Sequence, residues 1–236
     1  MRSRWIVFVG AGLLGLAGQT TSAGTIVQVG YGGGPGGFNG GVSTFSPNND
    51  DATTVNANVG SLELDLEGRE PFDLVLDVEN SVSSSGGSSV TEYLFTETIR
   101  NATGLTWSGL TLELGYYDGG GEFVLSGAFD FLDFDSGPDA PPQTGDMEGG
   151  GAQIPEPSSN VFHDLEHLAN QIVWSGGWVV SGGEVTLTFS IDVPDGIDGF
   201  VLRHRPAVVP EPASMLLLGS GLAGLAYALR RHRPSV

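Results

Sequence analysis

The fold class is decided by residues 184–193, which read EVTLTFSIDV. Apolar side chains occupy every second position from Val185 to Val193, and polar or acidic side chains occupy the positions between them. A period of two is typical of a β-strand that has one face in a core and one face in solvent. We therefore expect this stretch to be a central strand of a two-sided sheet.

The same alternation recurs along the chain. Leucines alternate with acids over residues 62–67, and apolar residues alternate with acids over much of residues 72–79. Glycine-rich turns separate these segments, which predicts an all-β fold: an antiparallel β-sandwich of jelly-roll or immunoglobulin-like order. The acids fall on the solvent side of the strands. Further strand candidates are Thr25–Val29, Val90–Arg100, Leu110–Tyr117, Glu122–Phe134, Asn170–Val180 and Gly199–His204.

The sandwich is predicted to be one acidic, glycine-rich domain over residues 24–208. Two segments within it, 31–49 and 136–160, are rich in glycine and proline and poor in alternation, so we expect long loops there. The second could instead separate two small domains. A single domain is favoured because the strands after it are too few for an independent sandwich.

Composition excludes several classes of function. The 236 residues include 28 acids and nine basic residues, all of them arginine, and no cysteine. A formal charge of −19 opposes unaided binding of nucleic acid. Without cysteine there is no disulfide framework, thiol catalysis or thiolate metal site, and without lysine there is no Schiff-base chemistry.

The N-terminus has the layout of a secretory signal. Arg2 and Arg4 precede an apolar run from Trp5 to Ala17, and small and polar residues follow as far as Ala23. This order predicts a signal peptide over residues 1–23, a helix that is passed to the export translocon and cleaved after Ala23.

The C-terminus combines three features. Pro210-Glu211-Pro212 leads into an uncharged stretch of 17 residues, 213–229. As a helix this stretch spans about 25 Å, near the short limit for crossing a bilayer. The basic cluster Arg230, Arg231 and Arg233 follows directly, and such clusters remain cytoplasmic. The preceding domain is therefore expected outside the inner membrane of a bacterium.

This tail, residues 209–233, resembles the PEP-CTERM sorting signal of exported bacterial proteins. The resemblance implies an exosortase-like membrane protease as partner, transient anchoring in the inner membrane, and delivery to the cell surface or an exopolysaccharide matrix. A second triplet, Pro155-Glu156-Pro157, is followed by polar residues, so the triplet alone is not specific. The alternative is a permanent single-span anchor with an incidental Pro-Glu-Pro.

The middle region carries a second resemblance, to the choice-of-anchor β-domains that occur upstream of such tails. Those domains have no established enzymatic activity, so the resemblance implies a surface protein. The residues concerned are Thr91-Glu92-Tyr93, Glu97, Asn101-Ala102-Thr103-Gly104 before Trp107, Glu113-Leu114-Gly115, Trp174-Ser175-Gly176-Gly177, Ile191-Asp192-Val193-Pro194-Asp195 and Leu202-Arg203.

One motif suggests catalysis. Residues 163–167 read HDLEH, an H-x-x-E-H pattern in which His163 and His167 would bind zinc and Glu166 would act as base if the segment were helical. Such a site needs a further carboxylate ligand downstream, and the only glutamate after Glu184 is Glu211, in the tail. We expect instead a polar, exposed helical turn beside the proline-rich loop.

Calcium is the other metal hypothesis. Asp130, Asp133, Asp135 and Asp139 surround a turn and offer the hard oxygen ligands that Ca²⁺ prefers, although the spacing is not that of an EF-hand. The alternative is a group of solvated acids beside a strand end.

Three tryptophans, Trp107, Trp174 and Trp178, could form a sugar-stacking platform on the sandwich or pack in its core.

The sequence as a whole predicts an exported, non-enzymatic surface or matrix protein without a required cofactor. A carbohydrate- or calcium-dependent binding module is the first alternative, and a secreted hydrolase is the second. Exopolysaccharide is a candidate partner. After removal of the signal and the tail, 27 acids face four arginines, so divalent cations are natural counterions.

Overall fold

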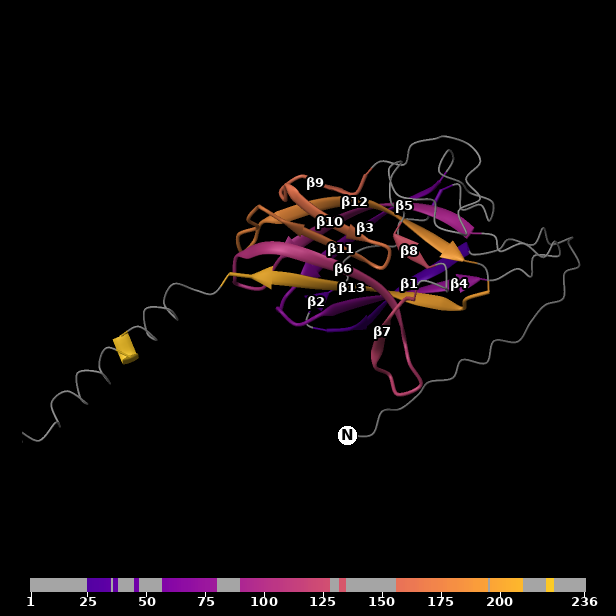
Figure 1. Ribbon diagram of the computed structural model, residues 1–236, viewed down its shortest axis with the longest axis horizontal. Helices are drawn as coiled ribbons and strands as arrows, with labels where there is room; N and C mark the ends of the chain where they lie inside the picture. The colour runs from indigo at the N-terminus through magenta and orange to yellow at the C-terminus, as the bar shows by residue number, and fades with distance from the viewer. Residues whose placement is uncertain are drawn as a thin grey trace, which may run out of the picture.

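The computed structural model describes residues 25–34, 36–37, 45–46, 57–79, 90–127, 132–134, 156–194, 196–209 and 220–222. Within these ranges the chain forms thirteen strands, arranged in two sheets that face each other (Figure 1). The predicted signal peptide and most of the predicted transmembrane segment lie outside the described residues.

Sheet A contains seven antiparallel strands. Its order is β1 (Thr25–Gly33), β4 (Phe72–Glu79), β13 (Gly199–Val208), β6 (Trp107–Tyr117), β11 (Gln171–Ser175) and β10 (Asp164–Leu168), and β7 (Phe123–Leu125) also pairs with β6. The long strand β6 pairs with β13 from residue 107 to residue 115, which forms the centre of the sheet.

Sheet B contains six strands. Its order is β2 (Gly36–Gly37), β3 (Asn58–Leu66), β5 (Val90–Asn101), β12 (Glu184–Pro194) and β8 (Asp133–Phe134), and β9 (Ser158–Ser159) also pairs with β12. Strands β3 and β5 run parallel, whereas the other pairs of this sheet are antiparallel. The prediction of an antiparallel sandwich is thus confirmed except at this pair.

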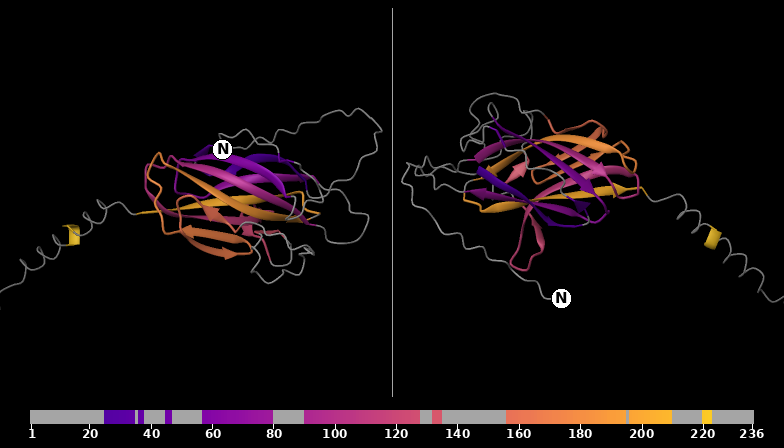
Figure 2. Two further views of the ribbon diagram at one scale, coloured as in Figure 1. Left: turned by 90° about the horizontal axis from the view of Figure 1, so that it is seen from above. Right: turned by 180° about the vertical axis from the view of Figure 1, so that it is seen from behind.

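The core lies between the two sheets and follows the alternation of the sequence. In β12, Val185, Leu187, Phe189, Ile191 and Val193 are all fully buried. The rings of Phe95 and Phe189, from neighbouring strands of sheet B, stack at 5.4 Å with an interplanar angle of 6°. The Trp174 ring of sheet A lies 6.4 Å from the Phe189 ring of sheet B, so the inner faces of the two sheets are in contact. Figure 2 shows the two sheets from two further directions.

A hydrogen-bonded corner joins β5 in sheet B to β6 in sheet A. The buried Asn101 amide donates to the carbonyl oxygens of Leu105 and Val179, at 2.7 and 2.8 Å. Its side-chain oxygen accepts from the Thr103 hydroxyl at 2.7 Å, and that hydroxyl in turn accepts from the Trp107 indole. Val179, the bridge partner of Trp107, is thereby tied to the corner. Side chains thus close this end of the sandwich.

One loop prediction and two strand predictions need correction. The 31–49 segment is not wholly a loop: β1 extends to Gly33, Gly36–Gly37 pairs with β3, and Phe45 is buried against the rings of Tyr93 and Phe95. Residues 122–134 are not one strand, since β7 joins sheet A and β8 joins sheet B. Residues 170–180 contain the five-residue β11 and a single bridge at Val179.

Candidate functional site

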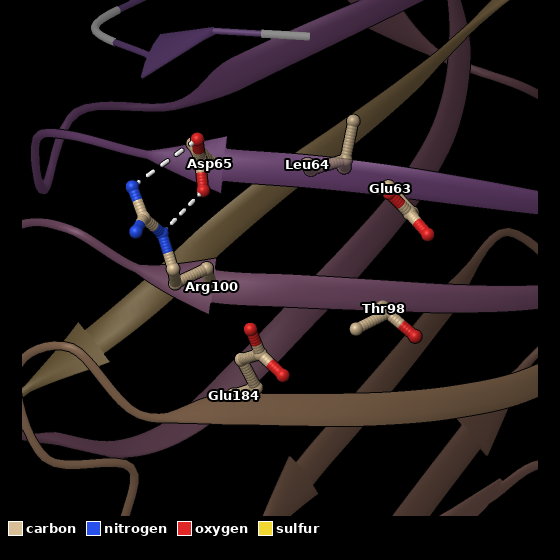
Figure 3. Close-up of a pocket in the computed structure, with 6 residues that line it drawn as sticks. All are labelled: Glu63, Leu64, Asp65, Thr98, Arg100 and Glu184. Carbon is tan, nitrogen blue, oxygen red and sulfur yellow. Dashed lines mark hydrogen bonds and ion pairs between the residues drawn. The ribbon is translucent and has the colours of Figure 1, made fainter. Parts of the chain in front are cut away.

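A shallow pocket of about 350 Å³ lies on the outer face of sheet B. Three adjacent strands line it, because Asp65 of β3 and Glu184 of β12 are both register partners of Arg100 in β5. Glu63, Leu64 and Thr98 complete the lining (Figure 3). The pocket therefore presents three carboxylates and one guanidinium on a flat, solvent-facing part of the sheet.

Arg100 is held in this pocket by Asp65. The Arg100 Nε atom lies 2.7 Å from Asp65 Oδ1, and the Arg100 side chain is 52% exposed. The hydrogen bond and the charge of Asp65, followed by the charges of Glu184 and Glu67, raise the pKa of Arg100 above its ordinary value. The carboxylates outnumber the single cation, so the pocket favours cationic or hydroxyl-rich ligands over anions.

A second group of charges lies on the outer face of sheet A. Arg203 of β13 makes a two-point contact with Asp73 of β4, with distances of 2.6 and 2.7 Å. The Tyr117 hydroxyl donates to the same carboxylate at 2.6 Å, and the Arg203 guanidinium lies 3.8 Å from the centre of the Phe123 ring. Burial and the Asp73 contact raise the pKa of Tyr117 to about 12.

The same face continues to Arg205. Its Nε atom lies 2.5 Å from a Glu113 carboxylate oxygen, and the Gln171 amide donates to the other oxygen at 3.2 Å. The carboxylates of Asp73 and Glu113 are thus occupied by arginine, tyrosine and glutamine donors, which joins four strands of sheet A. We interpret this network as structural, because its acids already accept strong hydrogen bonds.

A buried pair inside the sandwich was not predicted from the sequence. His204 Nε2 lies 2.8 Å from Glu97 Oε1, His204 Nδ1 lies 3.3 Å from the Phe72 carbonyl oxygen, and both side chains are 0% exposed. The pair links β13 of sheet A to β5 of sheet B across the core. Both side chains are closed to solvent, so we interpret the pair as a structural link between the two sheets.

The sequence did carry a signal for this pair. Glu97 occupies the same alternation phase as the buried Tyr93, Phe95 and Ile99, and His204 follows Leu202 in the buried phase of β13. A charged residue in a core phase indicates a partner in the core.

The H-x-x-E-H segment is extended, not helical. Residues 164–168 form β10, which pairs with β11, and His163 precedes this strand. Residues four apart on a strand lie about 13 Å apart, so His163 and His167 cannot share one metal ion in this conformation. The predicted helical turn is therefore wrong. Burial lowers the pKa of His167, which keeps its imidazole neutral at neutral pH.

The proposed calcium ligands are only partly visible. Asp133 lies in β8, where its register partner is Asp192 of β12; Asp130, Asp135 and Asp139 lie outside the described residues. Within the part of the chain that the structure describes, no group of three or more histidine or acidic side chains is arranged to hold a metal ion. Calcium binding therefore stays a prediction.

The three tryptophans do not form a common platform. Trp107 and Trp174 are buried, at 0% and 1% exposure, and Trp178 is 65% exposed. Core packing is thus confirmed for the first two, and a sugar-stacking surface made of all three is excluded.

The sandwich ends at Val208, the last residue of β13, and the tail follows it. The Val209 amide donates to the Thr106 carbonyl at 2.8 Å. Residues 208–231 match the PEP-CTERM protein-sorting motif. The match includes Pro210, Glu211 and Pro212 and the first two arginines of the basic cluster, Arg230 and Arg231. It supports an exported protein that is anchored in a membrane and recognised by an exosortase.

Val208 is the one residue of the described strands that the match includes, so the resemblance to choice-of-anchor domains stays a prediction. No curated protein and no solved structure matches this chain. All of the predicted sorting and cleavage residues lie outside the described residues: Ala23, Pro210, Glu211, Pro212, Arg230, Arg231 and Arg233. Among the described residues, no helix is long and apolar enough to cross a membrane.

Proposed function

We propose that the protein is an exported, non-enzymatic component of a bacterial cell surface or exopolysaccharide matrix. In this proposal a signal peptide over residues 1–23 directs export, and the PEP-CTERM tail holds the precursor in the inner membrane until an exosortase-like protease acts on it. The observation that carries the proposal is the sorting motif at residues 208–231.

The position of the motif supports this order of events. The motif begins at the last residue of β13, so the folded sandwich is separated from the apolar stretch 213–229 by only a few residues. A cut near Pro210 would leave every strand of the sandwich on the released side. The folded domain would therefore survive processing intact.

The surfaces of the sandwich support a passive role. The arginines of sheet A are engaged with carboxylates, and the buried Glu97–His204 pair is closed to substrate. The acids on the outer faces favour solubility and attract cations outside the cell.

Two glutamates in Pro-Glu-Pro triplets allow a matched test. Glu211→Ala alters the triplet of the sorting motif, and Glu156→Ala alters the upstream triplet at an exposed position. The chain and both variants are expressed in a host that encodes an exosortase and in the same host with that gene deleted. The intact mass of the exported protein is then measured.

We expect the unchanged chain and Glu156→Ala to lose the tail only when the exosortase is present, and Glu211→Ala to keep it. Tail removal that is independent of the exosortase gene, or equal in the two variants, would contradict the proposal.

A second candidate function is favoured by the acidic pocket. Glu63, Glu184 and Thr98 line it beside the Asp65–Arg100 pair on the outer face of sheet B, and this mixture of hydrogen-bond donors and acceptors suits a polyhydroxyl ligand such as an exopolysaccharide. Binding of neutral glycans by the chain, lost in Glu63→Gln/Glu184→Gln and kept in Glu156→Gln, would establish this function. Equal binding by both variants would exclude the pocket.

A further inference from the structure

An exposed apolar pair lies at one end of the sandwich. Trp178 is 65% exposed and Val180 is 61% exposed, whereas Val179 between them is 2% exposed. Val179 is fixed, because its backbone exchanges two hydrogen bonds with Trp107, at 3.0 and 3.1 Å. Alternate residues of an extended segment point to the same side. Trp178 and Val180 therefore face solvent together from a rigid backbone, and we call them the Trp178–Val180 patch.

This patch lies beside the point where the tail leaves the domain. Thr106, the residue before Trp107, accepts the hydrogen bond from Val209. Val179 and the end of β13 thus flank the start of β6 on opposite sides, and two strand spacings amount to about 10 Å. In Figure 1, β13 ends at this end of the sandwich, away from the β7 hairpin.

The length of chain after Val209 limits how far the patch can be from a membrane. Only Pro210, Glu211 and Pro212 separate Val209 from the apolar stretch 213–229. Four extended steps reach at most about 14 Å. When residues 213–229 enter the bilayer, this end of the sandwich is held within that distance of the lipid interface.

We propose that the Trp178–Val180 patch binds the headgroup–acyl boundary of the outer leaflet of the inner membrane in the anchored precursor. The inference rests on the proposed function, which places residues 213–229 in that membrane. Tryptophan suits this position because its ring is apolar and its N–H remains hydrated at the interface. The contact orients the sandwich and holds the Pro-Glu-Pro motif at a fixed height, where a membrane-embedded protease can reach it.

The test uses residues 24–236, the proposed anchored precursor without its signal peptide, in phosphatidylcholine vesicles whose acyl chains are brominated near the headgroup. The fluorescence then comes from Trp107, Trp174 and Trp178. The first two are buried in the core and are shielded from the quencher. We expect the bromolipid to quench part of the emission, and Trp178→Phe to abolish that quenching.

A matched control moves the fluorophore to the other end of sheet A. Val124 of β7 is 51% exposed and pairs with Tyr116, nine residues along β6 from Trp107. That separation is about 30 Å. We expect no bromolipid quenching from the added tryptophan of Trp178→Phe/Val124→Trp.

Flotation of the vesicles tests anchoring by residues 213–229 separately from lipid binding by the Trp178–Val180 patch. If the chain floats but Trp178 is quenched no more than the tryptophan introduced at position 124, the patch does not bind lipid and the anchoring proposal stands. If the chain does not float with the vesicles, anchoring by residues 213–229 fails and the inference fails with it.

Discussion

Removal of one partner from the buried Glu97–His204 pair tests what holds the two sheets together. In Glu97→Leu, His204 Nε2 loses the carboxylate at 2.8 Å and has no access to water, since both side chains are 0% exposed. Leaving a buried polar group without its hydrogen-bond partner costs about 1–3 kcal/mol. We expect a decrease of that size in the free energy of unfolding.

Replacing both partners separates the pair's net contribution from the penalty of an orphaned group. Phenylalanine at position 204 keeps a ring beside Phe72, whose centroid lies 5.9 Å from the imidazole. Glu97 Oε2 is buried and has no hydrogen-bond partner among the described residues, and an unsatisfied buried acceptor costs about 1–3 kcal/mol. We therefore expect Glu97→Leu/His204→Phe to be close to the unchanged chain in stability, or above it.

The assay is urea unfolding in a mild nonionic detergent, followed by the fluorescence of the buried Trp107 and Trp174. Glu97→Gln is a useful intermediate, because its amide can donate to a neutral His204 and should restore most of the lost stability. The slope against urea should stay constant in all variants, since the surface exposed on unfolding is unchanged.

Two results would refute this reasoning. A loss below about 1 kcal/mol in Glu97→Leu would mean that water or a rearranged side chain satisfies the imidazole, as in an ordinary exposed pair. A double variant as unstable as the single one would mean that the shape of the two side chains, and not their hydrogen bond, makes the pair necessary.

Two further predictions concern pH and calcium. Burial raises the pKa of Tyr93 to about 12, and an unfolded tyrosine titrates near pH 10, so this group's stabilisation is lost as the pH rises from about 10 to about 12. Tyr93→Phe loses the hydrogen bond from the Ile26 amide, at a cost of about 1 kcal/mol. Its free energy of unfolding should decrease less between pH 10 and pH 12 than that of the unchanged chain. An equal decrease of the two in urea titrations at alkaline pH would contradict this. If Asp130, Asp133, Asp135 and Asp139 bind calcium, millimolar Ca²⁺ should raise the melting temperature of the unchanged chain and should not change that of Asp130→Asn/Asp133→Asn. An equal shift of the melting temperature in both proteins, measured by calorimetry, would exclude this site.

The alternation of the sequence predicted the long strands well, because alternate side chains of these strands face the apolar core and the solvent. Leu62, Leu64 and Leu66 are buried in β3, as expected, and so are Val185 to Val193 in alternation along β12. The pattern could not predict that β3 and β5 run parallel. Alternation states which face a residue occupies, but not which strand is its neighbour or in which direction that strand runs.

The predictions for β10 and for Phe45 failed because neither segment has a repeating pattern of buried apolar residues. β10 is largely exposed, Leu165 and Leu168 included, because it is the last strand in the order of sheet A and its place depends on backbone pairing with β11. A strand that buries little leaves no hydrophobic period in its sequence. Phe45 was assigned to a glycine-rich loop although it packs against Tyr93 and Phe95; one aromatic residue among glycines is too short a signal to indicate burial.

The placement of the arginines explains how so acidic a chain keeps its sheets together. Arg100, Arg203 and Arg205 each pair with a carboxylate whose side chain is 13%, 7% or 10% exposed, respectively. Such acids are poorly hydrated, so an uncompensated charge there would cost more than on the open surface. These three arginines thus lie beside carboxylates that are largely shielded from water, and exposed acids such as Glu63, Glu166 and Glu184 remain in solvent, where salt screens their repulsion. The acids that remain unpaired with arginine give the outer surface a negative potential that attracts cations.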